Sequence, residues 1–325
     1  MNQKNLTRRS VLWASALAAA IPSLSFAQDG RPIEWVVGYA AGGGSDVVAR
    51  TVADAMSKTL GQPIVINNKP GAATNIAAGY VANSKDFGHV MLTADFATLA
   101  ANPWLFSKLP YDPQKDFLPV GMLARFPMLL VIAPNVPAKN LPEFIAWAKT
   151  ANGPLTYGSA GVGSPHHLAG ELFRERTGLS LQHAPYRGAA PAVQDLLGGQ
   201  IPFAFMDSAS VQQYVAAGKL RALGVASPAR LATMPEVSTI SEQGIKDFTA
   251  YAWQGLVVPA GVSPEVVSKL AKALQAALGS TQVKARFQAL ALEALPGTPQ
   301  QMTAYVNEER ERWGKVIKAN SIKLD

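Results

Sequence analysis

The chain has 325 residues, a formal net charge of +7 and no cysteine. The lack of cysteine excludes disulfides, thiol catalysis and thiolate metal sites, and the scattered basic residues give no support for nucleic-acid binding. A chain of this length can bury a large core, and we expect two domains.

The first 27 residues have the pattern of an export signal. Lys4, Arg8 and Arg9 precede a mostly apolar or small stretch over 11–24. Ser25 and Ala27 then place small residues at the two positions that a signal peptidase reads. The apolar run is shorter than the roughly 20 residues of a membrane span. We therefore expect cleavage after Ala27 and a periplasmic mature protein. The paired arginines also resemble a twin-arginine signal, so the Sec and the twin-arginine routes both stay open.

Short apolar runs alternate with helical patterns through most of the mature chain. The predicted strands are 33–38, 63–67, 89–93, 128–133, 155–158, 181–184, 203–206, 222–226 and 251–258. The predicted helices are 45–60, 75–83, 141–151, 166–177, 189–198, 208–216, 264–278, 282–289 and 299–319. This alternation predicts an α/β fold, with a parallel or mixed sheet flanked by helices.

Two positions suggest that the chain passes between two α/β lobes. The first lies near 125–127, before a strongly apolar strand, and the second lies near 250–254. Lobe 1 would then comprise 28–126 plus 253–325, and lobe 2 would comprise 127–252. Two lobes joined by two strands are typical of proteins that close by a hinge on a ligand held in a central cleft.

A glycine-rich loop lies between the first predicted strand and the first predicted helix. Gly42, Gly43 and Gly44 allow close approach of the backbone to a ligand, and the free amides at a helix N-terminus attract anions. The spacing matches neither a dinucleotide fingerprint nor a phosphate loop. Asp46 is placed either to cap the helix or to contact the ligand, and Ser45 could serve in either way.

A second loop, 157–167, repeats the order of strand, glycine-rich turn and helix start, so the two loops could hold one anion from opposite sides. Ser159 or Ser164 could instead be the nucleophile of a secreted hydrolase, with His167 and Asp207 as partners. The G-x-S-x-G elbow is absent, and Ser164 is placed to cap a helix. We therefore assign no catalytic residue. Asp207 is placed either to cap the next helix or to line the cleft.

The histidines give no metal-binding pattern. His166 and His167 are adjacent, so their side chains diverge on a helix, and no acid stands at the spacing of a zincin motif. His89 and His183 lie in or beside strands and are interpreted as structural. Arg187 could pair with a ligand carboxylate or form a salt bridge. We predict neither a metal nor a cofactor.

Seven segments, taken together and in order, carry a family resemblance. They are 38–50, 67–76, 108–117, 157–167, 183–201, 230–237 and 322–325. The set covers essentially the whole mature chain and resembles the extracytoplasmic receptors of the tripartite tricarboxylate transporter, called Bug receptors. The resemblance implies a type II periplasmic-binding fold, with two lobes that close on a small organic carboxylate without catalysis. It also implies delivery of that ligand to the membrane permease subunits.

The resemblance further implies which residues contact the ligand. Backbone amides and ordered waters of the first loop would hold the carboxylate. From lobe 1 the contacts would be Tyr39, Ala41, Gly42, Gly43, Ser45 and Asp46, and from lobe 2 Ser159, Ala160, Gly163, Ser164, His167 and Asp207. The family loop often has prolines where this chain has Ala40 and Ala41, a departure that predicts a looser or differently shaped loop.

The loop after the third predicted strand should also face the cleft. It contains Ala94, Asp95 and Phe96, of which the last two are bulkier than expected there. We hypothesise that Asp95 pairs with an amino group and that Phe96 stacks on an aromatic ligand. Phe96 as a cover over apolar core is the alternative.

The sequence as a whole predicts a monomeric solute-binding receptor that is not an enzyme. Two other classes stay open at this point. One is the serine hydrolase, and the other is a sensory receptor that signals to a membrane kinase.

Overall fold

The computed structural model describes residues 30–324. The predicted signal peptide and its cleavage site lie outside the described residues. The strands are β1 (Ile33–Val37), β2 (Ile64–Asn68), β3 (Val90–Asp95), β4 (Phe117–Ile132), β5 (Leu155–Ser159), β6 (Leu181–Pro185), β7 (Phe203–Asp207), β8 (Arg221–Val225), β9 (Tyr251–Pro259) and β10 (Glu293–Ala294).

The helices include two short non-α segments, marked η. They are α1 (Gly44–Leu60), η1 (Ala72–Thr74), α2 (Asn75–Ala82), η2 (Ala97–Ala101), α3 (Asn102–Leu105), α4 (Leu141–Ala148), α5 (Pro165–Thr177), α6 (Ala189–Leu197), α7 (Ser208–Ala216), α8 (Pro264–Gly279), α9 (Thr281–Ala289) and α10 (Pro299–Ala319). The predicted α/β alternation is confirmed. The helical segment 97–105 and the short strand β10 were not predicted.

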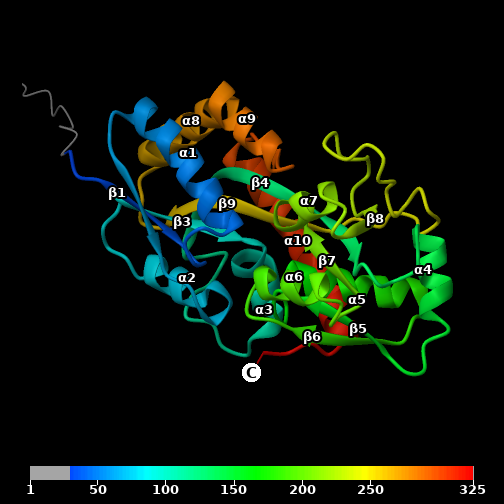
Figure 1. Ribbon diagram of the computed structural model, residues 1–325. Helices are drawn as coiled ribbons and strands as arrows, with labels where there is room; N and C mark the ends of the chain where they lie inside the picture. Colours follow the sequence, from blue (N-terminus) through cyan, green and yellow to red (C-terminus); the bar gives the residue numbers. More distant parts are fainter. Residues whose placement is uncertain (1–29, 325) are drawn as a thin grey trace, which may run out of the picture. The chain divides into compact units, whose positions relative to one another are not determined.

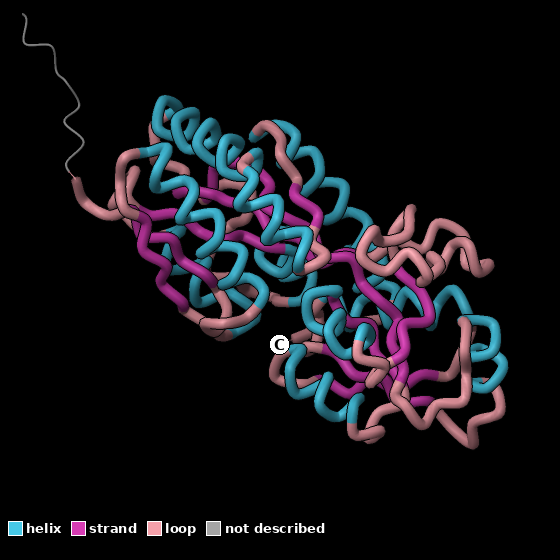
Figure 2. Tube along the Cα trace, turned by 45° about the horizontal axis from the view of Figure 1, so that its top comes forward, coloured by secondary structure: helices cyan, strands magenta, loops and turns pink. Residues whose placement is uncertain are grey.

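The strands form one continuous ladder in the order β2-β1-β3-β9-β4-β7-β5-β6, and β8 and β10 also pair with β4. The first three strands are parallel to one another, as are β5, β6 and β7. The antiparallel pair β4 and β9 lies between these two groups. Figures 1 and 2 show helices covering each group of strands, with the long strands β4 and β9 running from one group toward the other. This is the mixed α/β arrangement that was predicted.

Strand β4 is 16 residues long and begins well before the predicted strand 128–133. The prediction missed the first part of β4 because Pro119 and Gly121 interrupt the apolar pattern there. The register of β4 against β9 shifts between Pro119 and Gly121, and such irregular positions are where a strand tolerates proline and glycine.

The two segments predicted to carry the chain between lobes are neighbours in the sheet. Arg125 pairs with Trp253, Phe126 with Ala252 and Pro127 with Tyr251. The chain therefore leaves and re-enters the first strand group at the same level of the sheet. The exact lobe boundaries stay a prediction.

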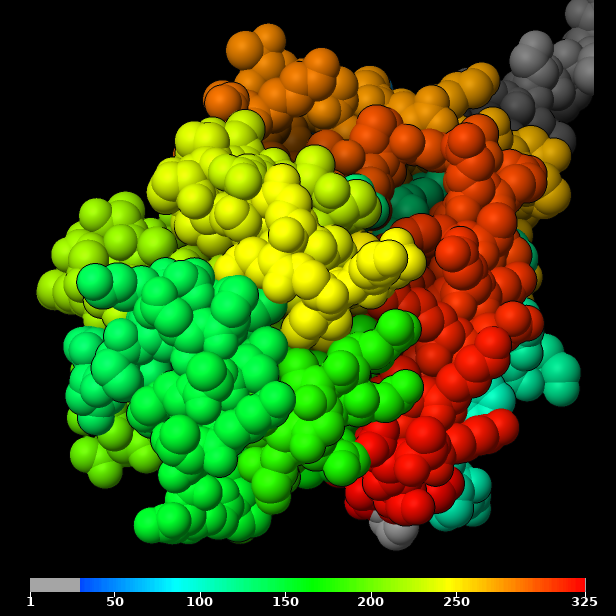
Figure 3. Space-filling model, turned by 90° about the vertical axis from the view of Figure 1, so that its right-hand side faces the viewer, coloured from blue at the N-terminus to red at the C-terminus, as the bar shows by residue number. Residues whose placement is uncertain are grey.

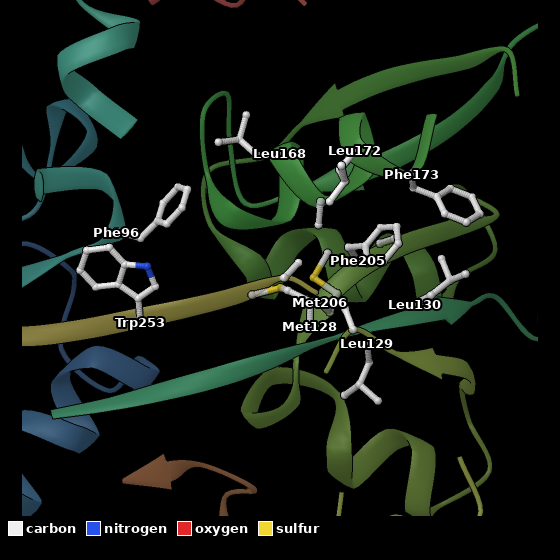
Figure 4. Packing of buried hydrophobic residues seen from close by; sticks show 14 of the residues in the cluster. Phe96, Met128, Leu129, Leu130, Leu168, Leu172, Phe173, Phe205, Met206 and Trp253 are labelled. Carbon is white, nitrogen blue, oxygen red and sulfur yellow. The ribbon is translucent and has the colours of Figure 1, made fainter. Parts of the chain in front are cut away.

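The main core follows β4 into the second strand group. Figure 4 shows the side chains of Met128, Leu129 and Leu130 on β4 near Met206 of β7 and Phe173 of α5. A second apolar cluster lies between α1, α8 and the other face of the first strand group. The strands that carry the candidate loops therefore pack on buried apolar side chains of these two clusters.

Helix α10 matches its predicted bounds. Thr298 and Gln301 form a reciprocal capping box at its start, and Met302, Val306 and Trp313 are buried on one face. The helix packs on β4 and η2 and also reaches α5. Figure 3 shows this C-terminal segment, in red, lying against green residues of the second strand group.

Candidate functional site

The loop between β1 and α1 is held in place by the carboxylate of Asp46. Its Oδ2 accepts hydrogen bonds from the Gly42 amide at 2.8 Å and from Arg50 Nε at 2.9 Å, and its Oδ1 accepts one from Asn68 at 3.0 Å. Burial opposes ionisation of this carboxyl, but the bonds from Arg50, Gly42 and Asn68 outweigh it and lower the pKa of Asp46. Asp46 is only 2% exposed, so it shapes the loop from within rather than facing a ligand.

The start of α1 is open. Gly43 is the N-cap residue, and no described side chain caps this end. Tyr39, Ala41, Gly42 and Gly43 are exposed. The first amides of a 17-residue helix are therefore available to an anion, as the glycine pattern predicted.

A buried carboxylate joins this loop to the loop after β3. Asp95 Oδ1 accepts hydrogen bonds from the amide of Thr98 at 3.0 Å and from its hydroxyl at 2.9 Å, and Tyr39 donates its phenol to Oδ2. Burial raises the pKa of Asp95, although these bonds oppose the shift. Tyr39 as a residue is 37% exposed, but desolvation of its hydroxyl at this bond, together with the neighbouring Asp95, raises the pKa of Tyr39. Asp95 is thus engaged within the protein, and the hypothesis that it pairs with a ligand amino group is wrong for this structure.

Phe96 and Ala94 are buried in the apolar core. The Phe96 ring is 1% exposed and packs edge-on against Trp253 at 6.0 Å and Trp313 at 5.6 Å between ring centroids; Figure 4 shows the first of these pairs. Ala94 is fully buried in β3, opposite Gly255. The stacking hypothesis for Phe96 is therefore wrong, and its alternative, a residue of the apolar core, is confirmed.

Gln254 is a site residue that the sequence reasoning missed. It lies on β9 opposite Asp95, and its Nε2 donates a hydrogen bond to Ser45 Oγ in the first turn of α1. Its Oε1 is buried and has no partner among the described residues. The strand 251–258 gave no local sign of this role, because the role depends on the register between β3 and β9.

In the second strand group, the predicted residues support one another at the carboxyl ends of β5 and β7. Ser159 Oγ and His183 Nε2 are hydrogen-bonded at 2.6 Å. Ser164 accepts a bond from the His167 amide and so caps α5. Asp207 accepts a bond from the Ser210 amide and so caps α7.

These pairings do not assemble a hydrolase triad. Asp207 lies 3.1 Å from His166 Nε2, whereas His167 Nδ1 accepts a hydrogen bond from the Gly163 amide at 3.0 Å. Ser159 is bonded to a third histidine, His183. Burial opposes ionisation of Asp207, but His166 and Ser210 outweigh it and lower the pKa of Asp207. The serine, the histidine and the acid of the predicted triad thus have different partners.

His167 and His183 support the second loop through hydrogen bonds to Gly163 and Ser159. Their rings stack at 3.7 Å between centroids. Burial lowers the pKa of His167 to about 4, and burial together with His167 lowers the pKa of His183 to about 3. Both rings are therefore neutral at pH 7, which lets His167 Nδ1 accept the Gly163 amide. The structural interpretation of His183 is confirmed. Residues 30–324 contain no group of three His, Asp or Glu side chains arranged to hold a metal.

Gly163 brings the second loop against the first part of the chain. It has φ of +73°, and a Cβ added there would lie 2.2 Å from Leu105 Cδ1 of α3. Only glycine fits this position. The contact shows that the loop after β5 lies close to the helix that follows β3 and η2.

Arg187 lies beside this loop and is exposed. The amides of Tyr186 and Gly188 bond the carbonyls of Ser159 and Ala160 at 3.1 and 3.2 Å. Arg187 itself has no hydrogen bond or ion pair to any described residue. Its predicted alternative, a salt bridge, is therefore not formed in this structure.

Residues 48–322 match the family model described as "Tripartite tricarboxylate transporter family receptor". The chain belongs to this family. BugT of Bordetella pertussis is 32% identical over 325 residues, which cover 100% of both chains. Among solved structures, the Rhodopseudomonas palustris protein Rpa4515 with adipate has a TM-score of 0.85 and 32% identity, covering 90% of this chain and 99% of that one. MatC of the same organism, with bound malate, has a TM-score of 0.80 and 34% identity, covering 88% and 99%.

Membership of the tricarboxylate receptor family confirms the predicted resemblance and the periplasmic-binding fold. It also makes the chain a receptor rather than an enzyme, in agreement with the dispersed triad. Among the described residues, no helix combines the length and the apolar character needed to cross a bilayer.

Within this member of the receptor family, the predicted site residues fall into two sets. Those that leave surface for a ligand are Tyr39, Ala41, Gly42, Gly43, Ser45, Ala160 and Ser164. Those that the fold buries are Asp46, Ala94, Asp95, Phe96, Ser159, Gly163, His167 and Asp207. The polar side chains of the buried set are engaged in hydrogen bonds within the fold, as buried polar groups generally are, and they support the loops. Contact of either set with a ligand stays a prediction.

Proposed function

We propose that the mature chain is a periplasmic, monomeric solute-binding receptor that captures a small organic dicarboxylate and delivers it to the membrane subunits of a tripartite transporter. The observation that carries this proposal is the open N-terminus of α1. Its first amides have no capping side chain in the described structure, and the carboxylate of Asp46 is engaged with the Gly42 amide of the preceding loop. Amides at a helix start, together with the helix dipole, favour a carboxylate.

A dicarboxylate is favoured over a monocarboxylate for two reasons. The solved structures of two relatives are of complexes with malate and with adipate, and both ligands have a carboxylate at each end. Arg187 supplies an unpaired guanidinium beside the second loop, and its planar fork matches a carboxylate. We assign one carboxylate to the start of α1 and the second to Arg187.

Hinge closure about β4 and β9 would bring these two contacts together. The strands that link the proposed lobes, 28–126 plus 253–325 and 127–252, pair with each other at Arg125–Trp253 and Pro127–Tyr251. A ligand that touches both loops stabilises the closed form by the contacts made only there. The permease would recognise that closed form. Export would follow the predicted signal, with cleavage after Ala27.

A thermal-shift panel tests the proposal. It compares aliphatic mono-, di- and tricarboxylates, aromatic acids and amino acids, because a ligand present at 100 times its Kd adds about 2.7 kcal/mol of stability. We expect the largest rise in Tm from aliphatic dicarboxylates, and a smaller rise from the corresponding half-amides. Failure of every carboxylate to raise Tm would contradict the proposal.

Arg187→Gln separates the two ends of the ligand. We expect it to weaken dicarboxylate binding about tenfold or more while leaving monocarboxylate binding unchanged. Arg176→Gln, which removes a charge from the last turn of α5, is the matched control. Equal affinities of the Arg187 variant and the wild type for a dicarboxylate would remove Arg187 from the site.

A further inference from the structure

A small cavity lies beside α10. None of the residues that line it belongs to the proposed ligand contacts. It has a volume of about 160 Å³. Its apolar wall includes Leu99 of η2, Phe117 of β4, Val257 of β9 and Met302 of α10. The cavity is therefore built from segments far apart in the sequence that meet where α10 packs on the first strand group.

One end of the cavity carries a positive charge. Arg310 lines it and is only partly exposed. The Nε of Arg310 donates to the carbonyl of Leu99 at 2.9 Å, which leaves its Nη atoms with no hydrogen-bond partner or ion pair among the described residues. Burial lowers the pKa of Arg310, with an opposing contribution from Asp112. A partly buried guanidinium without a counter-ion costs stability, and a bound anion would offset that cost.

No acidic side chain of the described structure lines the cavity to neutralise this charge. The other polar residues of the wall are Gln114, Thr303 and Asn307, all of which are neutral hydrogen-bonding groups. Asp112 influences Arg310 electrostatically, but its carboxylate bonds the Gln114 amide at 2.9 Å and Lys115 Nζ at 3.2 Å. The cavity therefore combines an apolar wall with one positive charge that has no ion pair among the described residues.

We propose that this cavity is a second binding site, separate from the proposed transport site, for a small organic anion with an apolar body. The anionic group pairs with the Nη atoms of Arg310, and the body packs against Leu99, Phe117 and Met302. Cavities of about 150 Å³ can hold a benzene ring, so the volume suits a single aromatic ring or a short aliphatic chain. The ligand class is thus a ring-sized or short-chain monocarboxylate.

Methyl NMR of the purified protein, with ¹³C-labelled methionine, tests this site directly. The probes are benzoate and butyrate, and their neutral counterparts benzamide and butyramide. Met302 lines the cavity, so its methyl signal reports occupancy, and Met302→Leu identifies that signal. Met128, buried in β4 away from the cavity wall, is the internal reference.

We expect a saturable shift of the Met302 signal with benzoate or butyrate, and binding at least about tenfold weaker for the amides, because the charge-assisted bond to Arg310 is lost. Arg310→Gln should remove the shift. Lys315→Gln, which removes a charge from an exposed position of the same helix, should keep it. Ligand-induced thermal shifts from the dicarboxylate panel should survive in Arg310→Gln, which keeps the two sites distinguishable.

Three outcomes would overturn the proposal: no saturable Met302 shift with either carboxylate, equal binding of acid and amide, or an unchanged shift in Arg310→Gln. If Arg310→Gln does not fold, the comparison of benzoate with benzamide on the wild type still decides the matter.

Discussion

The phenol of Tyr39 donates a hydrogen bond to the carboxylate of Asp95, 56 positions away in the sequence. The bond joins the loop after β1 to the loop after β3. The buried carboxylate of Asp95 therefore anchors the loop whose backbone is proposed to hold the ligand carboxylate. Asp95 is further fixed by the amide and hydroxyl of Thr98. The side chain that was predicted to touch the ligand instead aligns the loop that would bind it.

Tyr39→Phe tests this arrangement. The variant removes the donor to Asp95 Oδ2 and leaves a buried acceptor less satisfied, so we expect a loss of about 1–3 kcal/mol in the free energy of unfolding. Dicarboxylate affinity should also fall, because the loop loses its anchor. Urea unfolding and calorimetric titration measure the two effects. Tyr80→Phe, which removes an exposed bond to Glu34, is the control and should bind normally. Normal stability and binding in Tyr39→Phe would contradict an anchoring role.

Asp46→Asn tests the support of the first loop from inside α1. The variant loses the charge that attracts Gly42 and Arg50, and we expect a destabilisation of about 1–2 kcal/mol together with weaker ligand binding. Asp54→Asn, on the same helix, removes the charge from an exposed carboxylate that contacts Lys58 at 2.8 Å and Gln282 at 3.0 Å, and it should leave binding unchanged. The same calorimetric titration compares the two variants. Equal affinities would show that the loop does not depend on Asp46.

Phe96→Ala distinguishes a core residue from a ligand contact. The ring is buried between Trp253 and Trp313, so we expect a loss of about 3–5 kcal/mol in unfolding free energy. The ranking of ligands in the thermal-shift panel should not change. Phe87→Ala, at a ring that is 46% exposed, is the control and should cost much less. A change in ligand ranking without loss of stability would restore the stacking hypothesis.

Acid should destabilise the protein through His167. The folded-state pKa of His167 is about 4, below the value near 6.5 of an unfolded chain. Below pH 6.5 the unfolded state therefore binds more protons, and the stabilisation by neutral His167 is lost as the pH falls from about 6.5 to 4. At pH 7, where it is fully present, this stabilisation by neutral His167 is roughly 3 kcal/mol.

Urea unfolding between pH 7 and pH 4 measures this loss. Protonation of Nδ1 would also remove the acceptor of the Gly163 amide, so ligand affinity should fall over the same range. His167→Asn should lower stability at pH 7 and make its dependence on pH less steep, although the contribution of His183, whose pKa is also lowered, remains. A slope as steep as that of the wild type would assign the effect to other groups.

Local patterns predicted the strands, the helices and both glycine-rich loops, because apolar periodicity and capping residues act over a few positions. Ser164 was recognised as a cap for this reason, and capping was one of the two alternatives for Asp207. Helices α7 and α10 have their predicted bounds. The pattern failed at the start of β4, where Pro119 and Gly121 occupy an irregular stretch of the ladder. It also missed the helical segment 97–105, since the buried face there includes the neutral polar residues Thr98 and Asn102.

The sequence by itself determined the α/β class, the order of the elements and the family, which follow from short-range pattern and ordered motifs. Only the tertiary structure decided what the site residues do. Ser45 meets Gln254 from 209 positions away, and His166 rather than His167 meets Asp207. The physical reason is that such partners are selected by strand order and register. Those depend on how the whole core packs, and no local window of the chain contains that information.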